Sequence, residues 1–244
     1  MTITGIIPAR YGSTRFPGKP LAMIGNMTMI ERVYRQAEKS TRLHSVFVAT
    51  DDQRIFDTVK SFGGHAVMTS ADHQTGTERC AEAVSFLPDN TDAVINIQGD
   101  EPFLEPSQID KVAELLLNSE VEIATLIRHA SGMEEVSNPN AVKAVMNQNG
   151  RAIYFSRLPI PYYKNEIPFE QRCYHIHVGI YGYKISTLKE IVNLKPATLE
   201  LAESLEQLRW IENGYSIHAA LTNENNRAVD TPEDLERLKE NLRL

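Results

Sequence analysis

Short apolar runs alternate with segments of helical periodicity through the first half of the chain. The apolar runs predict buried strands, and apolar residues spaced three or four positions apart predict amphipathic helices between them. The predicted strands are residues 3–7, 46–50, 66–69, 93–98 and 122–127, and the predicted helices lie near residues 30–37, 55–62, 78–86 and 107–117. This alternation indicates βαβ units and a mostly parallel sheet.

The pattern changes after residue 127. Apolar runs at 141–146 and 152–155 flank an Asn-Gln-Asn-Gly sequence that predicts a hairpin, and three prolines follow between 159 and 168. The remaining predicted elements are a strand at 175–184, helices at 187–192 and 199–213, a strand at 215–221 and a helix from Pro232 with Thr231 as its N-cap. We therefore expect one α/β domain over residues 1–244, a doubly wound, mostly parallel sheet with an inserted β-rich segment at 140–185.

Composition narrows the class of protein. The chain has 244 residues, of which 42% are hydrophobic and 23% charged, as in ordinary globular domains. Its formal net charge of -7 argues against a broad basic face for nucleic acid, so we expect no nucleic-acid partner. Cys80 and Cys173 lack metal-ligand spacing, which favours free thiols in a reducing compartment. No apolar run has the length of a membrane span, and we expect a cytoplasmic protein.

Cations gather in the loop that follows the first predicted strand. Arg10, Arg15 and Lys19 lie within ten residues of one another, in a loop whose two glycines would let the backbone approach a phosphate. The loop is not a P-loop, because five residues separate Gly12 from Gly18 and Pro20 replaces the magnesium-binding Ser or Thr. Composition alone leaves a solvated basic turn and a phosphate-binding loop equally open.

Two aspartates follow apolar residues at distant points of the chain. Asp100 comes two residues after the end of the predicted strand at 93–98, and Asp230 precedes the last predicted helix. If both enter the crevice at the carboxyl ends of the strands, they form a carboxylate pair of the kind that binds magnesium together with phosphate and water. The alternative for Asp230 is a favourable anion at a helix N-terminus, and spacing alone does not exclude it.

These segments resemble a known family over essentially the whole chain. The first loop, Ile-Pro-Ala-Arg-Tyr-Gly-Ser-Thr-Arg-Phe-Pro-Gly-Lys-Pro-Leu, is similar to the N-terminal signature of the bacterial 3-deoxy-manno-octulosonate (Kdo) cytidylyltransferases. Further blocks match in the family's order: residues 49–52, 68–69, 72–79, 96–102, 154–157, 177–181, 205–209 and 229–235. The resemblance implies a nucleotide-diphospho-sugar transferase-like fold, two substrates, CTP and Kdo, and a homodimer that pairs through the β-rich segment.

The resemblance also implies a role for each matched residue. The nucleotide would be bound by Ala9, Arg10, Ser13, Arg15, Lys19, Arg79 and Gln98. The acid sugar would be bound by Arg157, His177, Tyr181, Glu206 and Gln207. Mg²⁺ would be held by Asp100 and Asp230, which with Arg10 and Lys19 form the implied catalytic set. A surface ion pair with Glu78 or Glu82 remains an alternative for Arg79, and a structural role remains one for His177.

The implied reaction is transfer of CMP from CTP to the anomeric hydroxyl of Kdo, which gives CMP-Kdo and pyrophosphate for lipopolysaccharide biosynthesis. Two alternatives stay open: a cytidylyltransferase for another acid sugar, such as 8-amino-Kdo or a sialic acid, and a non-catalytic nucleotide-binding regulator. The presence of both Asp100 and Asp230 weighs against the regulator. No Gly-x-Ser-x-Gly or His-Glu-x-x-His motif occurs, so a hydrolase of either kind is disfavoured.

Overall fold

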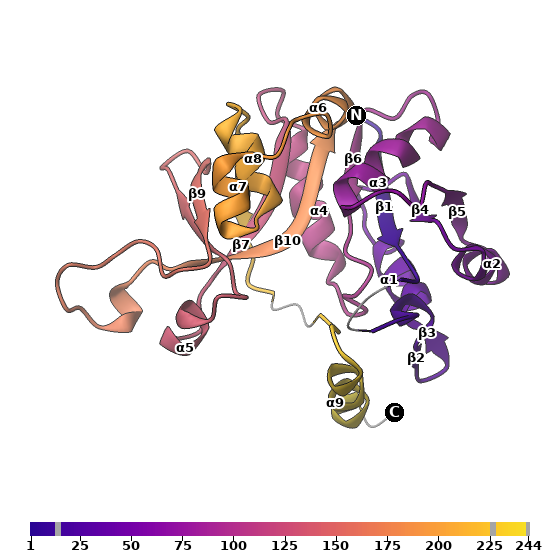
Figure 1. Cartoon of the computed structure of the whole chain (residues 1–244), viewed down its shortest axis with the longest axis horizontal. Helices are drawn as coiled ribbons and strands as arrows, with labels where there is room; N and C mark the ends of the chain where they lie inside the picture. The colour runs from indigo at the N-terminus through magenta and orange to yellow at the C-terminus, as the bar shows by residue number, and fades with distance from the viewer. Residues whose placement is uncertain (13–15, 225–227, 243–244) are drawn as a thin grey trace.

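A twisted sheet runs through the molecule, with helices on both faces (Figure 1). The computed structural model describes residues 1–12, 16–224 and 228–242. Within these residues the main strand order is β11-β7-β10-β6-β1-β4-β5, with β8 and β9 branching from β10. The strands are β1 (Ile3–Ala9), β4 (Ser45–Thr50), β5 (His65–Met68), β6 (Ala93–Asn96), β7 (Ile123–His129), β8 (Lys143–Met146), β9 (Ala152–Ser156), β10 (His175–Lys184) and β11 (Ile217–Leu221), and β2 (Met23–Ile24) pairs with β3 (Met27–Thr28) in a separate ribbon. The main path is parallel except on either side of β10, so the expected α/β class and mostly parallel sheet are confirmed.

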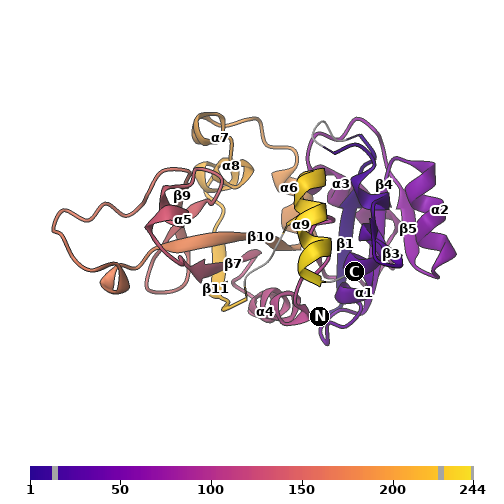
Figure 2. The same cartoon turned by 90° about the horizontal axis from the view of Figure 1, so that it is seen from below.

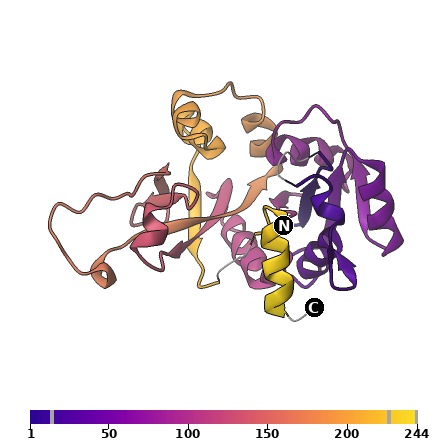
Figure 3. The ribbon, with the colours of Figure 1, turned by 60° about the horizontal axis from the view of Figure 1, so that its bottom comes forward.

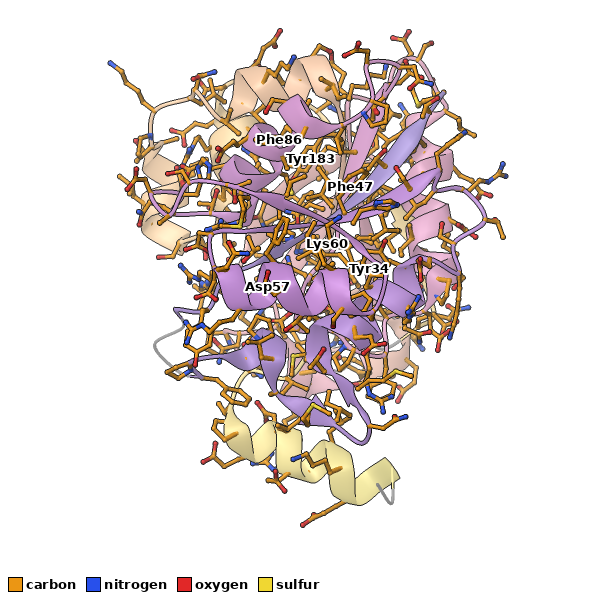
Figure 4. All side chains as sticks on the ribbon, turned by 90° about the vertical axis from the view of Figure 1, so that its right-hand side faces the viewer. Tyr34, Phe47, Asp57, Lys60, Phe86 and Tyr183 are labelled. Carbon is orange, nitrogen blue, oxygen red and sulfur yellow. The ribbon has the colours of Figure 1, made fainter. Side chains whose placement is uncertain are left out.

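The helices divide between the two faces of the sheet. Their bounds are α1 (Met29–Ala37), α2 (Gln53–Ser61), α3 (Gly76–Ala83), α4 (Pro106–Leu116), α5 (Met133–Ser137), α6 (Ile185–Ile191), α7 (Thr198–Glu203), α8 (Glu206–Glu212) and α9 (Pro232–Leu242). Apolar residues of α1, α2 and α4 pack in one buried cluster, and those of α3, α6 and α8 pack in another on the opposite face. Figure 4 looks onto α2, which buries Ile55 and Val59 and leaves Asp57 and Lys60 exposed. No helix in the described part of the chain has the length and apolar character needed to cross a membrane.

Local capping chemistry sets several helix starts. The Thr231 side chain accepts a hydrogen bond from the Asp234 backbone amide at the start of α9, as the sequence predicts, and the Thr28 side chain accepts one from the Glu31 backbone amide at the start of α1. Helix α3 begins earlier than expected, because Thr75 and Glu78 form a reciprocal capping box. This box brings the first turn of α3 to the edge of the sheet where the candidate site lies.

The segment from 140 to 185 contributes both an outlying hairpin and a central strand. Strands β8 and β9 pair antiparallel around the Asn-Gln-Asn-Gly turn, as predicted. Strand β10 has the predicted bounds but lies between β6 and β7, inside the main sheet. Residues 157–174, here called the arm, extend away from the body of the molecule (Figures 1 and 2). Leu158 and Tyr162 on the arm are 70% and 86% exposed.

The end of the chain returns to the first half of the fold. The Val229 backbone amide donates a hydrogen bond to the Asp100 carbonyl oxygen at 2.9 Å. Leu235 and Leu238 of α9 pack in a small buried cluster with Ile24, beside the ribbon of β2 and β3. Figure 3 shows α9 at this end of the molecule, far from the arm. These contacts bring Asp230 to the same edge of the sheet as Asp100.

One predicted helix is wrong. Residues 199–213 were expected to form a single helix, but α7 ends at Glu203 and α8 begins at Glu206. Ser204 between them has φ 52° and ψ 49°, in the left-handed region that is unfavourable for a residue with a side chain. The break changes the direction of the chain immediately before two residues with predicted roles in sugar binding.

Candidate active site

A cavity of about 340 Å³ opens at the carboxyl ends of β1 and β6. This position agrees with the rule that ligands of open α/β sheets bind beyond the carboxyl ends of the strands. Most of the predicted site residues lie in its wall. The lining residues are Pro8, Ala9, Arg10, Lys19, Pro20, His73, Gln74, Thr75, Gly76, Thr77, Arg79, Asn96, Gln98, Gly99, Asp100, Tyr181, Glu206 and Asp230.

The basic loop forms one wall of the cavity. Gly18 has φ 72°, which favours glycine, and its amide donates a hydrogen bond to the Tyr11 carbonyl oxygen at 2.9 Å. The Arg54 guanidinium lies 3.4 Å from the centre of the Tyr11 ring and packs over it. The loop therefore has a fixed base, from which Arg10 and Lys19 line the cavity. The predicted contacts of Ser13 and Arg15 lie outside the described residues.

Lys19 lies between the two aspartates. Its Nζ is 2.8 Å from Asp100 Oδ2 and 3.5 Å from Asp230 Oδ1. The side chains of Lys19 and Asp100 are 16% and 25% exposed, so their ion pair is only partly solvated. Segments more than a hundred residues apart thus place two carboxylates close enough to share one cation.

The carboxylate pair fits a divalent cation. Both groups offer oxygen ligands, which magnesium prefers. In the described part of the chain no cluster of three or more His, Cys, Asp or Glu side chains has metal-binding geometry. Two protein carboxylates then leave coordination positions for phosphate oxygens and water, as is usual for magnesium bound with a nucleotide.

Arg79 and Gln98 line the cavity but also have protein partners. Arg79 is 4% exposed; its Nη1 donates to Thr69 Oγ1 at 2.6 Å and its Nη2 lies 3.3 Å from Asp51 Oδ1. The surface ion pair with Glu78 or Glu82 considered from sequence is therefore wrong, because Arg79 is buried and its partner is Asp51. Gln98 Nε2 donates to the Gly179 carbonyl oxygen at 2.8 Å.

Glu206 lies opposite the basic loop, at the first turn of α8. Its Oε2 accepts a hydrogen bond from Thr77 Oγ1 at 2.7 Å. Burial raises the pKa of the Glu206 carboxyl above its ordinary value, against the lowering effect of this hydrogen bond. The Tyr181 hydroxyl is buried and has no hydrogen-bond partner in the part of the chain that the structure describes. A buried hydroxyl without a partner is a candidate to bind a polar ligand.

Aromatic packing fixes the start of α8 on the sheet. Trp210 lies edge-on to Tyr181 and Tyr183, with ring centroids 5.2 and 5.6 Å apart. All three side chains belong to one buried cluster. The packing holds α8 against β10, which carries Tyr181, and so places Glu206 and Tyr181 at the same wall.

Three residues with predicted sugar contacts lie outside the cavity wall. His177 accepts or donates a hydrogen bond at Thr125 Oγ1, 3.0 Å away, and burial lowers its pKa to about 4, so the imidazole is neutral at neutral pH. Gln207 is 6% exposed on α8. Arg157 bonds to three backbone carbonyl groups outside the cavity. Their contacts with the sugar stay predictions.

Sequence reasoning missed several residues of the cavity wall. His73, which the sequence analysis assigned no role, lines the cavity, and its Nε2 lies 2.5 Å from Glu82 Oε2. Thr75 and Thr77 were not assigned a role, although the Thr75 and Glu78 spacing is a capping-box signal for a helix that begins at the cavity.

The fold and the site together define a class of protein. An α/β sheet whose first loop brings Arg10 and Lys19 to a carboxylate pair is typical of enzymes that act on nucleotide phosphates. The family model described as "Cytidylyltransferase" matches residues 4–217.

Full-length relatives narrow the class further. The chain is 47% identical to a 3-deoxy-manno-octulosonate cytidylyltransferase of Bacteroides thetaiotaomicron, covering 100% of this chain and 99% of the relative. It is 49% identical to the enzyme of the same name from Cytophaga hutchinsonii, covering 98% and 96%. A solved structure of CMP:2-keto-3-deoxy-manno-octonic acid synthetase complexed with CTP superposes with a TM-score of 0.93 at 39% identity, over 100% of this chain and 99% of that one. The chain belongs to the family of 3-deoxy-manno-octulosonate cytidylyltransferases.

Proposed function

We propose that the protein transfers CMP from CTP to the anomeric hydroxyl of Kdo, giving CMP-Kdo and pyrophosphate for lipopolysaccharide biosynthesis. The hydroxyl oxygen forms a bond to the α-phosphorus of CTP, and the bond from that phosphorus to the bridging oxygen breaks. One observation carries the proposal: one cavity is lined by Arg10 and Lys19 of the first loop, by two aspartates that share the Lys19 ammonium, and by polar residues of α3, β10 and α8. The names of the full-length relatives support the choice of substrates.

Arg10 and Lys19 would bind the phosphates of CTP. Pyrophosphate gains negative charge as it leaves, and fixed cations in a partly desolvated cavity stabilise that charge. The contact between Gly18 and Tyr11 holds the loop that carries both cations. Ser13 and Arg15 are proposed to complete the phosphate contacts from the same loop.

Asp100 and Asp230 would hold Mg²⁺. When bound, this ion would lower the pKa of the attacking hydroxyl and neutralise phosphate charge. Lys19 would then leave the position that it takes between the carboxylates and donate to phosphate oxygens. No side chain of the cavity needs to act as a general base.

The two substrates would bind to different walls. Ala9, Arg79 and Gln98 would contact the nucleoside of CTP. Tyr181 and Glu206 would contact the hydroxyl groups of the sugar, with His177 and Gln207 as the other family-derived candidates. Among the described residues the Tyr181 hydroxyl has no hydrogen-bond partner, so it could bond to a hydroxyl group of the sugar.

Pyrophosphate release from CTP tests the proposal. The enzyme would be assayed with Mg²⁺ and, separately, Kdo, 8-amino-Kdo and a sialic acid. We expect the highest kcat/KM with Kdo. A higher value with another acid sugar would reassign the substrate, and nucleotide binding with no turnover of any sugar would favour the regulator.

We further propose a cytoplasmic homodimer that pairs through the region from 141 to 184. Ile153, Leu158 and Tyr162 are large apolar side chains that this region leaves exposed. Isologous pairing would bury them on both copies. Cys80 and Cys173 form no disulfide, and free thiols are typical of proteins in a reducing compartment such as the cytoplasm.

A further inference from the structure

The turn between α7 and α8 determines the position of Glu206, the residue of α8 that lines the cavity. Helix α8 starts at Glu206, which lines the cavity, only two residues after Ser204. Ser204 has a left-handed backbone conformation, which a residue with a side chain adopts at a cost and keeps only when its surroundings hold it. The residues that hold this turn therefore control the position of Glu206.

The Arg157 guanidinium binds this turn and is not among the residues that line the cavity. Its Nε donates to the Glu203 carbonyl oxygen at 2.6 Å, and its Nη2 donates to the Ser204 carbonyl oxygen at 3.2 Å. Its Nη1 donates to the Pro139 carbonyl oxygen at 3.0 Å. A cation at the last carbonyl groups of α7 also interacts favourably with the helix dipole. All three guanidinium nitrogens thus bond to backbone oxygens.

The Glu203 carboxylate in turn binds residues at and just after the end of β9. Its Oε2 accepts a hydrogen bond from the Arg157 backbone amide at 2.8 Å, and its Oε1 accepts one from Ser156 Oγ at 2.7 Å. Lys143, which is 0% exposed, donates through Nζ to the carbonyl oxygens of Arg157 at 2.5 Å and Asn138 at 2.8 Å. The end of β9 and the turn before α8 are therefore joined in both directions. Figure 1 shows β9, α7 and α8 side by side.

We propose that Arg157 and Glu203 form a clamp that positions Glu206 and Gln207 for the acid sugar. Arg157 is then a positioning residue that acts through the α7–α8 turn and does not contact the sugar carboxylate. This inference rests on the proposed cytidylyl transfer, because the sugar is the ligand whose binding the clamp affects. It also names Glu203 as a determinant of sugar binding.

A substitution of Glu203 distinguishes direct binding of the sugar by Arg157 from positioning of Glu206. The two roles predict opposite changes in the KM for Kdo. Glu203→Gln keeps the size of the side chain and removes a negative charge near Arg157. If Arg157 bound the sugar carboxylate directly, this loss of competing charge would leave the KM for Kdo unchanged or lower it. If the clamp positions Glu206, the weakened contacts raise the KM for Kdo several-fold.

The full experiment measures kcat and the KM for each substrate by pyrophosphate release. We expect Arg157→Ala to raise the KM for Kdo on the order of tenfold to a hundredfold, since small displacements of a binding group are costly, with the KM for CTP within about twofold. Ser204→Gly in the Arg157→Ala background should recover part of the loss, because glycine adopts the left-handed conformation readily. Glu120→Gln removes the same charge at an exposed position outside the clamp and is the matched control. All variants are compared by circular dichroism.

Two results would overturn the clamp: a wild-type or lower KM for Kdo in Glu203→Gln, or no recovery in the Ser204→Gly double variant. The wild-type enzyme tests the proposed function separately. If it releases no pyrophosphate in the presence of Kdo, the proposed function is wrong. In that case the same comparison is made with whichever acid sugar supports turnover.

Discussion

Replacing Lys19 by Met should lower turnover while strengthening the binding of Mg²⁺ to the enzyme without nucleotide. The ammonium group lies 2.8 Å from Asp100 and 3.5 Å from Asp230, so it offsets one of the two negative charges of the pair that we propose as the metal site. The substitution keeps an unbranched side chain and removes the charge. A bound cation then no longer competes with the Lys19 ammonium for the carboxylate oxygens, and the departing pyrophosphate loses one positive partner.

The magnitudes follow from the contacts. Loss of one charge-assisted contact to the transition state costs about 3–4 kcal/mol, or roughly 10²–10³-fold in kcat/KM. Loss of the ion pair should lower the free energy of unfolding by about 1–2 kcal/mol, because Asp230 is 42% exposed and contributes little. For a chain of this length that corresponds to roughly 2–8 °C in Tm.

Pyrophosphate release gives the turnover, and thermal unfolding with and without Mg²⁺ gives the metal effect. Mg²⁺ should raise the Tm of Lys19→Met more than that of the wild type. Lys60→Met, at an exposed position on α2, removes the same charge elsewhere and serves as the control. Turnover within threefold of the wild type, or an equal Mg²⁺ effect on both Tm values, would refute this account of Lys19.

Three further predictions concern the carboxylates, pH and assembly. Asp100→Asn and Asp230→Asn should keep the circular dichroism spectrum and lose Mg²⁺-dependent pyrophosphate release; wild-type rates at low Mg²⁺ would remove that residue from the site. The hydrogen bonds of Arg128 lower the pKa of Glu135 from 4.5 to about 2, so this pair stabilises the fold above pH 4.5 and the stabilisation is lost as the pH falls toward 2. Glu135→Gln should therefore lower the free energy of unfolding by about 2–3 kcal/mol at pH 7 and by much less near pH 2, as measured by urea unfolding. Light scattering should give a dimer mass for the wild type and a smaller mass for Ile153→Glu, and an unchanged dimer would place the interface elsewhere.

The sequence predicts the parts of the fold that local chemistry determines. The apolar alternation of β10 and the caps at Thr28 and Thr231 are local signals, and the structure agrees with them. The convergence of Lys19 and Asp100 is also predictable, because both follow strands whose carboxyl ends meet at one edge of a parallel sheet. A short-range pattern and one topological rule are sufficient for this part of the site.

The break between α7 and α8 could not be predicted in the same way. Helical apolar spacing continues through Ser204, and serine has no preference for the left-handed conformation that ends α7. The conformation depends on Arg157 and Glu203, which are 46 residues apart. A tertiary contact has therefore overridden the local pattern.

The same contact explains why Arg157 is difficult to interpret from sequence. An arginine in a sugar-binding block is expected to bind the carboxylate of the sugar, since a guanidinium suits that group. In the folded chain the guanidinium nitrogens bond to the carbonyl oxygens of Pro139, Glu203 and Ser204. A matched block identifies a residue that the site requires, but it does not distinguish a ligand from a residue that holds the ligands in place. Only the partners of each side chain make that distinction, and for Arg157 they are backbone carbonyl groups of residues that do not line the cavity.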